Sequence, residues 1–283
     1  MIQPTDDVNG TILHIGAGEC QELSYYLETS AETVVLVEPN PEAATKLRQQ
    51  SAAHFSRINI HEMAVSKSDG KAPFKVLNYP AFSSLHESIQ LRTLFPGLLC
   101  AKQVEVETKS ATNFFNEIEL NPRKKNWLIV DAPGDELEIL QACKKNNHLH
   151  KFQFVTLHCS VLNSYRESIE SIDIKCWLVQ QGYKVNQTDD SDPDSIILLF
   201  SLDVLRVENR ALKEENIKLK SDLSASLRQK SLQEADLEEL KKRYLEVREA
   251  EKRQHELLIR IKQSLLVAKE YLHLLEDRFT KKQ

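Results

Sequence analysis

Short runs of apolar residues, many of them β-branched, recur through residues 1–201 and alternate with segments that have the apolar spacing of a helix. Thr11–Ile15 (TILHI), Val34–Val37 (VVLV) and Trp127–Val130 (WLIV) are apolar at nearly every position, as expected of strands buried on both faces. Further strands or short extended pieces are predicted at residues 57–61, 74–77, 103–107, 152–157 and 195–200, and residues 103–107 (QVEVE) alternate apolar and polar positions.

Helices are predicted between these strands, at Gln21–Leu27, Pro41–Arg48, Glu136–Cys143 and Glu167–Gln181. Proline suits the first turn of the second helix, and Gly182 ends the last one. Strands that alternate with helices predict an α/β fold with a mostly parallel sheet and helices on both faces. In such a fold ligands bind at the carboxyl ends of the strands, so functional residues are expected there.

From Leu202 onward the apolar residues follow the alternating spacing of three and four that a coiled coil requires. With Leu202 at position a, 16 of the 23 a and d positions are apolar, which favours a coiled coil over a merely polar helix. The chain therefore divides into a domain at residues 1–201 and a coiled-coil oligomerisation region at 202–283. The a positions are Leu202, Asn209, Asn216, Leu223, Lys230, Leu237, Tyr244, Glu251, Leu258, Leu265, Leu272 and Phe279, and the d positions are Leu205, Leu212, Leu219, Ser226, Gln233, Leu240, Val247, Gln254, Ile261, Ala268 and Leu275.

Asparagine at two successive a positions, Asn209 and Asn216, is the pattern that fixes register in parallel two-stranded coils. We therefore expect a homo-oligomer, most simply a parallel dimer. Two alternatives fit the same residues. One is an antiparallel hairpin that turns within Ser221–Ser231, and the other is an amphipathic helix at Leu257–Leu275 that lies on a membrane surface.

Charge separates the two parts of the chain. The whole sequence has 37 Lys and Arg and 42 Asp and Glu, and 19 and 16 of these lie from Ser201 onward, which leaves 18 and 26 before it. The resulting net charges of −8 and +3 give neither part the basic character of a nucleic-acid-binding protein, so no nucleic-acid partner is expected.

The cysteines and the hydropathy pattern indicate a compartment. Five cysteines are scattered without CxxC spacing, which argues against a zinc ribbon or a disulfide framework and fits reducing conditions. The first ten residues lack a signal-peptide pattern, and no apolar run reaches the ~20 residues needed to span a bilayer. The cytoplasm is the expected location.

Two strand ends carry residues typical of a nucleotide site. The turn after the first strand, His14–Cys20 (HIGAGEC), contains Gly16 and Gly18, which let a ligand approach the backbone, although a tight turn without a ligand has the same pattern. The second strand ends at Glu38, an acid suited to both hydroxyls of a ribose, although a solvated loop Glu would look the same. Together, within one βαβ unit, they favour a nucleoside ligand.

A longer series of segments lies within residues 12–200, namely GAG, VVLVEPNP, INIHEMAVSKSDGKAPFKV, FSSL and IVDAPGDELEIL. In content and order this series resembles the FkbM-type S-adenosylmethionine-dependent methyltransferases. The resemblance implies a Rossmann-like methyltransferase fold, S-adenosylmethionine as the cofactor, and methylation of an oxygen on a sugar or another small molecule.

The resemblance also implies roles for residues of this chain. Gly16 and Gly18 would lie against the methionine part of the cofactor, Glu38 would bind the ribose, and Met63 and Ala64 would flank the adenine.

A fourth strand end supplies the first of three candidate bases. Asp131 would face the methionine part or the reacting centre, and an oxygen acceptor needs a base nearby, for which Asp131, His86 and His158 are the candidates. Each of them would also suit a purely structural role. No metal is expected, because His148 and His150 have no Cys, Asp or Glu at matching spacing.

Three residues depart from the family's pattern. His14 stands where an Asp is expected, Cys20 where a Gly is expected, and Pro133 where an acid is expected. A histidine does not reproduce a carboxylate beside a cation, and a protonated one would repel the cation. Glu19 is a candidate substitute for one missing acid.

Two functions follow from this pattern. The first is a cytoplasmic O-methyltransferase that acts on a sugar, glycan or polysaccharide precursor and is held as an oligomer by its tail. Methyltransferase domains joined to coiled coils also occur in polysaccharide chain-terminating systems, which is an analogy of architecture. The alternative is a catalytically degenerate methyltransferase fold that serves as the head of a coiled-coil scaffold, and the three departures motivate it.

Overall fold

The computed structural model of the chain describes residues 2–88, 90–160, 165, 168–192 and 194–280. The chain forms two compact units, Met1–Asn209 and Arg210–Gln283.

A seven-stranded sheet organises the first unit, in the order β3-β2-β1-β7-β8-β10-β9. The neighbours β3, β2, β1, β7 and β8 all run parallel, whereas β10 pairs antiparallel with both β8 and β9. From β1 the chain adds strands in one direction as far as β3 and later in the other from β7, so the strand order reverses beside β1. The strands are β1 Thr11–Ile15, β2 Thr33–Val37, β3 Ile58–His61, β7 Asn126–Val130, β8 Phe152–Ser160, β9 Tyr183–Asp192 and β10 Ser195–Leu202.

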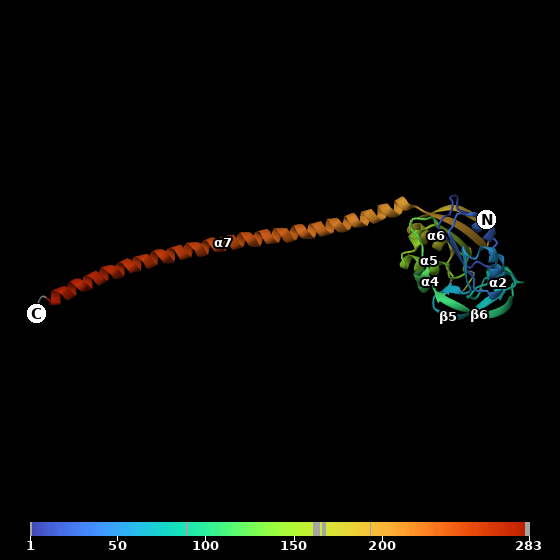
Figure 1. The fold of residues 1–283 in the computed structure, drawn as a ribbon, viewed down its shortest axis with the longest axis horizontal. Helices are drawn as coiled ribbons and strands as arrows, with labels where there is room; N and C mark the ends of the chain where they lie inside the picture. The colour runs from blue at the N-terminus through green and yellow to red at the C-terminus, as the bar shows by residue number, and fades with distance from the viewer. Residues whose placement is uncertain (1, 89, 161–164, 166–167, 193, 281–283) are drawn as a thin grey trace. The chain divides into compact units, whose positions relative to one another are not determined.

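Helices cover both faces of this sheet, with α4, α5 and α6 on one side and α2 on the other (Figure 1). Alternate residues of β1 belong to two cores: Leu13 packs in the core that contains Phe115 and Leu140, and Ile12 packs in the core that contains Tyr26 and Leu47. The confirmed architecture is thus a three-layer α/β fold. Its helices are α1 Leu23–Glu28, α2 Pro41–Gln50, α4 Ala111–Glu117, α5 Glu136–Lys145 and α6 Ser171–Gln180, with 3₁₀ turns at Ala52–His54, Pro80–Phe82 and Leu149–Lys151.

A second, three-stranded sheet has the order β4-β6-β5. Its strands are β4 Ala64–Ser66, β5 Gly70–Leu77 and β6 Cys100–Ser110, and the short helix α3 covers Leu91–Leu94. The two extended pieces predicted at residues 74–77 and 103–107 are the C-terminal half of β5 and the centre of β6, and these strands pair antiparallel.

The differences from the prediction include one helix boundary and one strand. The helix expected over Glu167–Gln181 is α6, which begins at Ser171, and Glu167 itself lies outside the described residues. The strand β9 was not predicted, because its sequence YKVNQTDDSD is mostly polar. This antiparallel strand at the sheet edge packs only one of its faces against the core. Polar residues are therefore tolerated at the alternate, exposed positions.

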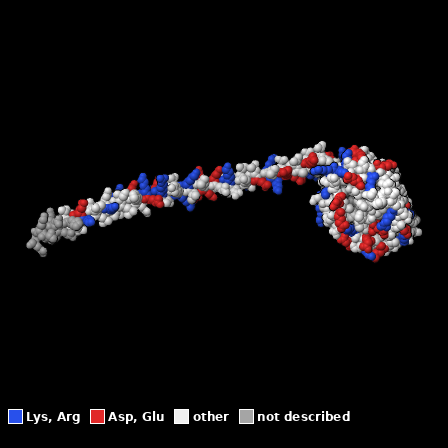
Figure 2. Space-filling model, viewed as in Figure 1, with Lys and Arg blue, Asp and Glu red and all other residues white. Residues whose placement is uncertain are grey.

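The second unit is built on one long helix, α7, which covers Val204–Thr280. It continues without interruption through Ser221–Ser231, so the predicted alternative of a hairpin turn in this segment is wrong. Lys and Arg are interspersed with Asp and Glu along it (Figure 2). Leu205, Leu212 and Leu219 of the heptad series are each more than half exposed, while the side chains of Leu275 and Phe279 lie outside the described set. Within the described residues, no helix is long and apolar enough to cross a membrane.

Candidate functional site

A pocket of about 640 Å³ opens at the carboxyl ends of β1, β2, β7 and β8. This is the edge beside which the strand order reverses, where open α/β sheets bind their ligands. The pocket lining includes seven of the eight residues predicted for the site: Gly16, Gly18, Glu38, Met63, Ala64, Asp131 and His158. The fold therefore brings together, at one pocket, predicted site residues that are far apart in the chain.

The turn after β1 contains two glycines, and different structural constraints apply to each. Gly16 has a φ of +86°, and a Cβ there would lie 1.7 Å from the carbonyl oxygen of Asp131, so the close approach at Gly16 is to another strand end. Gly18 has a φ of +56°, and a Cβ there would meet nothing within 4 Å, which leaves open space above its backbone. Only Gly18 thus has the free surface expected for close contact with a ligand.

Glu38 is buried at the end of β2 and holds the loop in place. Its Oε2 accepts a hydrogen bond from the Gly18 N–H at 2.7 Å, and its Oε1 accepts one from the Asn40 N–H, also at 2.7 Å. Burial raises the pKa of Glu38 to about 7, although these two hydrogen bonds lower it, and the nearby charge of Asp131 adds to the rise. Each carboxylate oxygen retains a further lone pair for a ligand hydroxyl.

Asp131, which directly follows β7, and His158, near the end of β8, form a pair in the pocket wall. His158 Nδ1 lies 3.0 Å from Asp131 Oδ2, and both side chains are about a quarter to a third exposed, at 25% and 32%. Burial lowers the pKa of His158, but the charge of Asp131 and its hydrogen bond outweigh burial, so the pKa lies above its ordinary value of 6.5. A histidine oriented by a carboxylate at Nδ1 has Nε2 available for proton transfer.

The third candidate base, His86, has a different setting. Its Nε2 lies 3.0 Å from Asp135 Oδ2, although the two atoms are not aligned for a hydrogen bond. The His86 ring fills the space over Gly134, where a Cβ would lie 2.6 Å from its Cδ2. Asp135 lines the pocket, whereas His86 is not among the lining residues. The structure therefore places His86 behind the loop that follows β7.

His14, the first departure from the family pattern, is buried and contacts a tyrosine. His14 is only 3% exposed, and its Nδ1 lies 3.1 Å from the hydroxyl of Tyr26. Burial lowers the pKa of His14 to about 4, which the charge of Asp131 opposes and that of His158 reinforces, so the ring is neutral near pH 7. A neutral His14 does not repel a cation, as a protonated one would.

The structure also shows the surroundings of the other two departures, Cys20 and Pro133, and of Glu19. Cys20 takes a φ of +46°, which a side chain rarely adopts, and it is buried. Glu19, the candidate substitute acid, lines the pocket but forms an ion pair with Lys46. Pro133 also lines the pocket, and its carbonyl accepts a hydrogen bond from the hydroxyl of Ser84 at 2.6 Å.

Sequence reasoning missed Tyr26, Glu22 and Asp135. Tyr26 lies inside a short helix and reads as an ordinary core residue, since nothing in the sequence shows that it meets His14. Asp135 directly precedes α5 within the segment DAPGDE, so its place in a motif was a usable signal.

The sequence was also compared with protein families and with solved structures. The profile of the methyltransferase FkbM domain matches residues 13–185. Among solved structures the chain is similar to a methyltransferase FkbM from Methylobacillus flagellatus KT, with 14% identity and a TM-score of 0.44 over 71% of this chain and 45% of that chain. This chain thus spans less than half the length of that protein.

Two further structures show similarity at lower identity. One is a ribosomal protein L11 methylase from Lactobacillus delbrueckii subsp. bulgaricus, with 10% identity and a TM-score of 0.38 over 70% of this chain and 71% of that chain. The other is TrmK of M. capricolum in complex with S-adenosyl-homocysteine, with 9% identity and a TM-score of 0.39 over 70% of this chain and 64% of that chain. No curated protein matches. Because the FkbM domain profile matches more than half of its residues, the chain belongs to the methyltransferase FkbM family.

Proposed function

We propose that this protein is a cytoplasmic S-adenosylmethionine-dependent methyltransferase that transfers a methyl group to a hydroxyl of a sugar, glycan or polysaccharide precursor. The observation that carries the proposal is the convergence of Glu38, the open backbone at Gly18 and the Asp131–His158 pair on one pocket at the switch point of the sheet.

The residues present fit a cofactor of this type. Glu38 is a buried acid that lines the pocket, and its two oxygens already organise the surrounding backbone, as a ribose-binding acid requires. Met63 and Ala64 give an apolar wall on which an adenine would pack, and the backbone at Gly18 leaves room for close approach. When bound, S-adenosylmethionine supplies an electrophilic methyl group.

The protein's part in such a transfer is orientation and removal of a proton. An attacking hydroxyl must lose its proton, and His158 lines the pocket with Nδ1 fixed by Asp131. In this arrangement Nδ1–H donates to the carboxylate and Nε2 accepts the proton, so His158 is the base and Asp131 its positioning partner. His86, which contacts Asp135 behind the loop, holds that loop in place.

An aromatic side chain at the pocket supports a sugar-type acceptor. Tyr79 lines the pocket, is 58% exposed, and has its ring 5.0 Å from that of Phe82. An exposed ring of this kind offers an apolar face for the C–H face of a sugar and a hydroxyl for its polar edge. Transfer of a labelled methyl group from S-adenosylmethionine to a panel of oligosaccharides tests this, and Tyr79→Ala should raise KM more than it lowers kcat.

A second candidate function rests on His14. A buried, neutral imidazole stands where the family's pattern has an acid, so residue 14 itself does not supply the negative charge expected there beside a cationic cofactor. The alternative is therefore a catalytically degenerate head on a coiled-coil scaffold. Heat of binding with S-adenosylhomocysteine supports the enzyme, and none at millimolar ligand supports the scaffold.

For the tail we propose a parallel, in-register dimer of α7 with a second copy of this chain. Leu205, Leu212 and Leu219 leave an apolar face exposed along the first heptads. Burial of such a face against an identical one is the ordinary way in which a long heptad helix becomes stable in water.

Charge complementarity favours this arrangement over an antiparallel one. In a parallel dimer each g position meets the e position five residues further along the second copy. Glu208 would meet Lys213, Glu215 would meet Lys220, and Asp236 would meet Lys241, all oppositely charged, against one repulsive pair of Arg243 with Arg248. An antiparallel pair sets e against e, and the e positions are basic near both ends, at Lys213, Lys220, Lys262 and Lys269.

A further inference from the structure

We propose that His14, Cys20 and Glu22 form a binding site for a thiophilic divalent metal ion of the Zn²⁺ type. This inference does not depend on the proposed methyl transfer, since it concerns the protein and the metal alone.

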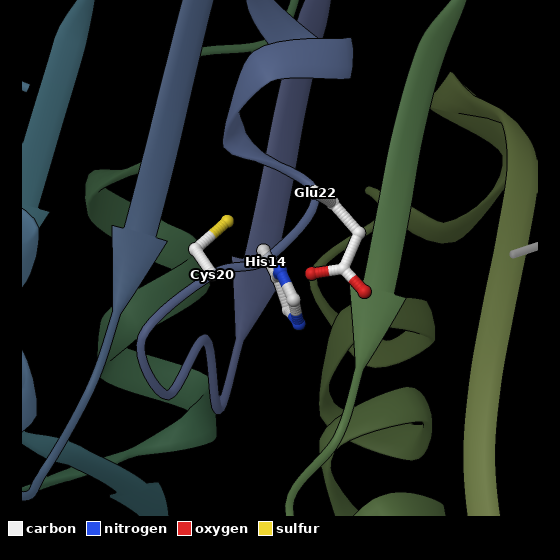
Figure 3. Close-up of side chains that lie close together, drawn as sticks. All are labelled: His14, Cys20 and Glu22. Carbon is white, nitrogen blue, oxygen red and sulfur yellow. The ribbon is translucent and has the colours of Figure 1, made fainter. Parts of the chain in front are cut away.

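Three different donor types meet at one point of the fold. His14 lies on β1, and Cys20 and Glu22 lie in the turn between β1 and α1, so that the turn folds back over the histidine (Figure 3). A ring nitrogen, the Sγ of Cys20 and a carboxylate oxygen of Glu22 all lie within 4.8 Å of one another. Donor atoms around a tetrahedral Zn²⁺ lie roughly 3.5 Å apart, so small side-chain rotations close the site.

An unpartnered nitrogen provides a second, independent observation. His14 Nε2 is buried and has no hydrogen-bond partner among the described residues, which is costly for a polar atom. The ring that carries it lies beside the carboxylate of Glu22 (Figure 3). Since the Tyr26 hydroxyl engages Nδ1 at 3.1 Å, Nε2 is the nitrogen left for a ligand. Metal-binding histidines commonly have this arrangement, with the other nitrogen hydrogen-bonded to a fixed group.

The other two donors are also available. Cys20 is a free thiol in the interior, not a disulfide partner. Among the residues that the structure describes, the Glu22 carboxylate accepts no hydrogen bond and forms no ion pair. Neither donor has to leave an existing partner to bind an ion.

The donor set selects the class of metal. Sulfur together with imidazole nitrogen suits Zn²⁺ and other thiophilic ions, whereas Mg²⁺ and Ca²⁺ prefer oxygen ligands. Three protein ligands leave a fourth position open, as in zinc sites that bind water or a ligand. All three residues line the pocket, so that position is available to a pocket ligand with carboxylate, amine or thiolate donors.

Cobalt titration of the full chain tests the site, because Co²⁺ binds tetrahedral zinc sites and reports a thiolate ligand by an absorption band. The chelator-treated, reduced protein should bind one Co²⁺ per chain, show the thiolate band, and lose it when Zn²⁺ is added. Cys20→Ser should abolish the band, and Glu22→Gln, which alters a half-buried side chain and spares the fold, should weaken Co²⁺ binding about ten-fold or more. Cys176→Ser, at an exposed thiol outside the pocket, is the matched control and should leave the band unchanged.

Three results would overturn the proposal: no thiolate band at an excess of Co²⁺, a band that survives Cys20→Ser, or Glu22→Gln binding Co²⁺ as tightly as the unaltered chain. Circular dichroism of each variant separates loss of the site from loss of the fold. Binding of S-adenosylhomocysteine is measured separately, so failure of one proposal does not decide the other.

Discussion

The carbonyl oxygen of Asp131 occupies the space that a Cβ at residue 16 would need, at 1.7 Å from its ideal position. Gly16 thereby sets the end of β7 against the turn after β1, and the Asp131 N–H donates to the Ile15 carbonyl at 2.8 Å. The backbone that presents the Asp131 side chain to the pocket is fixed by this contact.

Gly16→Ala should therefore be much more damaging than Gly18→Ala. Both glycines have positive φ, which costs an L-residue about 1–2 kcal/mol, but only residue 16 would also collide with backbone. We expect Gly18→Ala to lose about 1 kcal/mol and Gly16→Ala about 3 kcal/mol of the free energy of unfolding. Urea denaturation of the two variants measures the difference, and equal losses would mean that the packing against Asp131 relaxes freely.

The Asp131–His158 pair predicts a pH profile for methyl transfer. The base acts in its neutral form, and the pKa of His158 lies above 6.5 because Asp131 outweighs burial. With S-adenosylmethionine saturating, so that ionisation of Glu38 does not limit cofactor binding, kcat/KM for the acceptor should therefore rise with pH through the pKa of His158 and then level off. Asp131→Asn removes the charge and leaves burial, so the rise should move to lower pH, while the plateau falls about 100-fold through loss of the correct orientation.

Two controls accompany this profile. His158→Gln should remove the rise altogether, and His86→Gln should leave the midpoint of the rise in place, because His86 contacts Asp135 instead. A midpoint that follows His86 and ignores His158 would contradict the assignment of the base.

Charge reversal in the tail tests the parallel register. Glu208→Lys with Glu215→Lys replaces attraction by repulsion at four symmetric pairs, which should weaken the dimer by about 2 kcal/mol. Adding Lys213→Glu and Lys220→Glu should restore it. Glu214→Lys, at an outward f position, is the control. Sedimentation equilibrium measures all of these, and no rescue by the second pair of changes would argue against the parallel alignment.

The asparagines give a separate prediction about specificity. Light scattering of the full chain should give about twice 32.5 kDa. Changing Asn209 and Asn216 to Leu should raise Tm and broaden the oligomer number, because a buried amide pair costs stability while it fixes register. A monomeric unaltered chain would contradict the dimer.

The central strands were predictable from sequence for a simple physical reason. β1, β2 and β7 are buried on both faces, so their composition alone separates them from their surroundings. β9 at the sheet edge and the small sheet of β4, β5 and β6 were not recognised as such. Their pairing is decided by contacts between distant segments, for example Phe74 opposite Val104.

The features of the candidate site likewise include some that were predictable from sequence and some that were not. Gly18, Glu38 and Asp131 are predictable because they occupy strand ends, and the topology brings strand ends together. The Tyr26–His14 contact, the burial that keeps His14 neutral, and the partnership of His86 with Asp135 depend on side-chain packing. No local pattern encodes such contacts between segments far apart in the sequence.

Calorimetric titration of S-adenosylhomocysteine at pH 8, where Glu38 with its pKa of about 7 is ionised, tests the account most directly. The unaltered chain should bind with a measurable heat. Glu38→Gln should weaken binding about ten-fold or more, since hydrogen bonds to a charged group contribute about 1.5–3 kcal/mol. Glu62→Gln, at an exposed acid paired with Arg48 outside the pocket, should bind as the unaltered chain does. No heat from the unaltered chain at millimolar ligand, or equal affinity of the Glu38→Gln variant, would contradict a cofactor site built on Glu38.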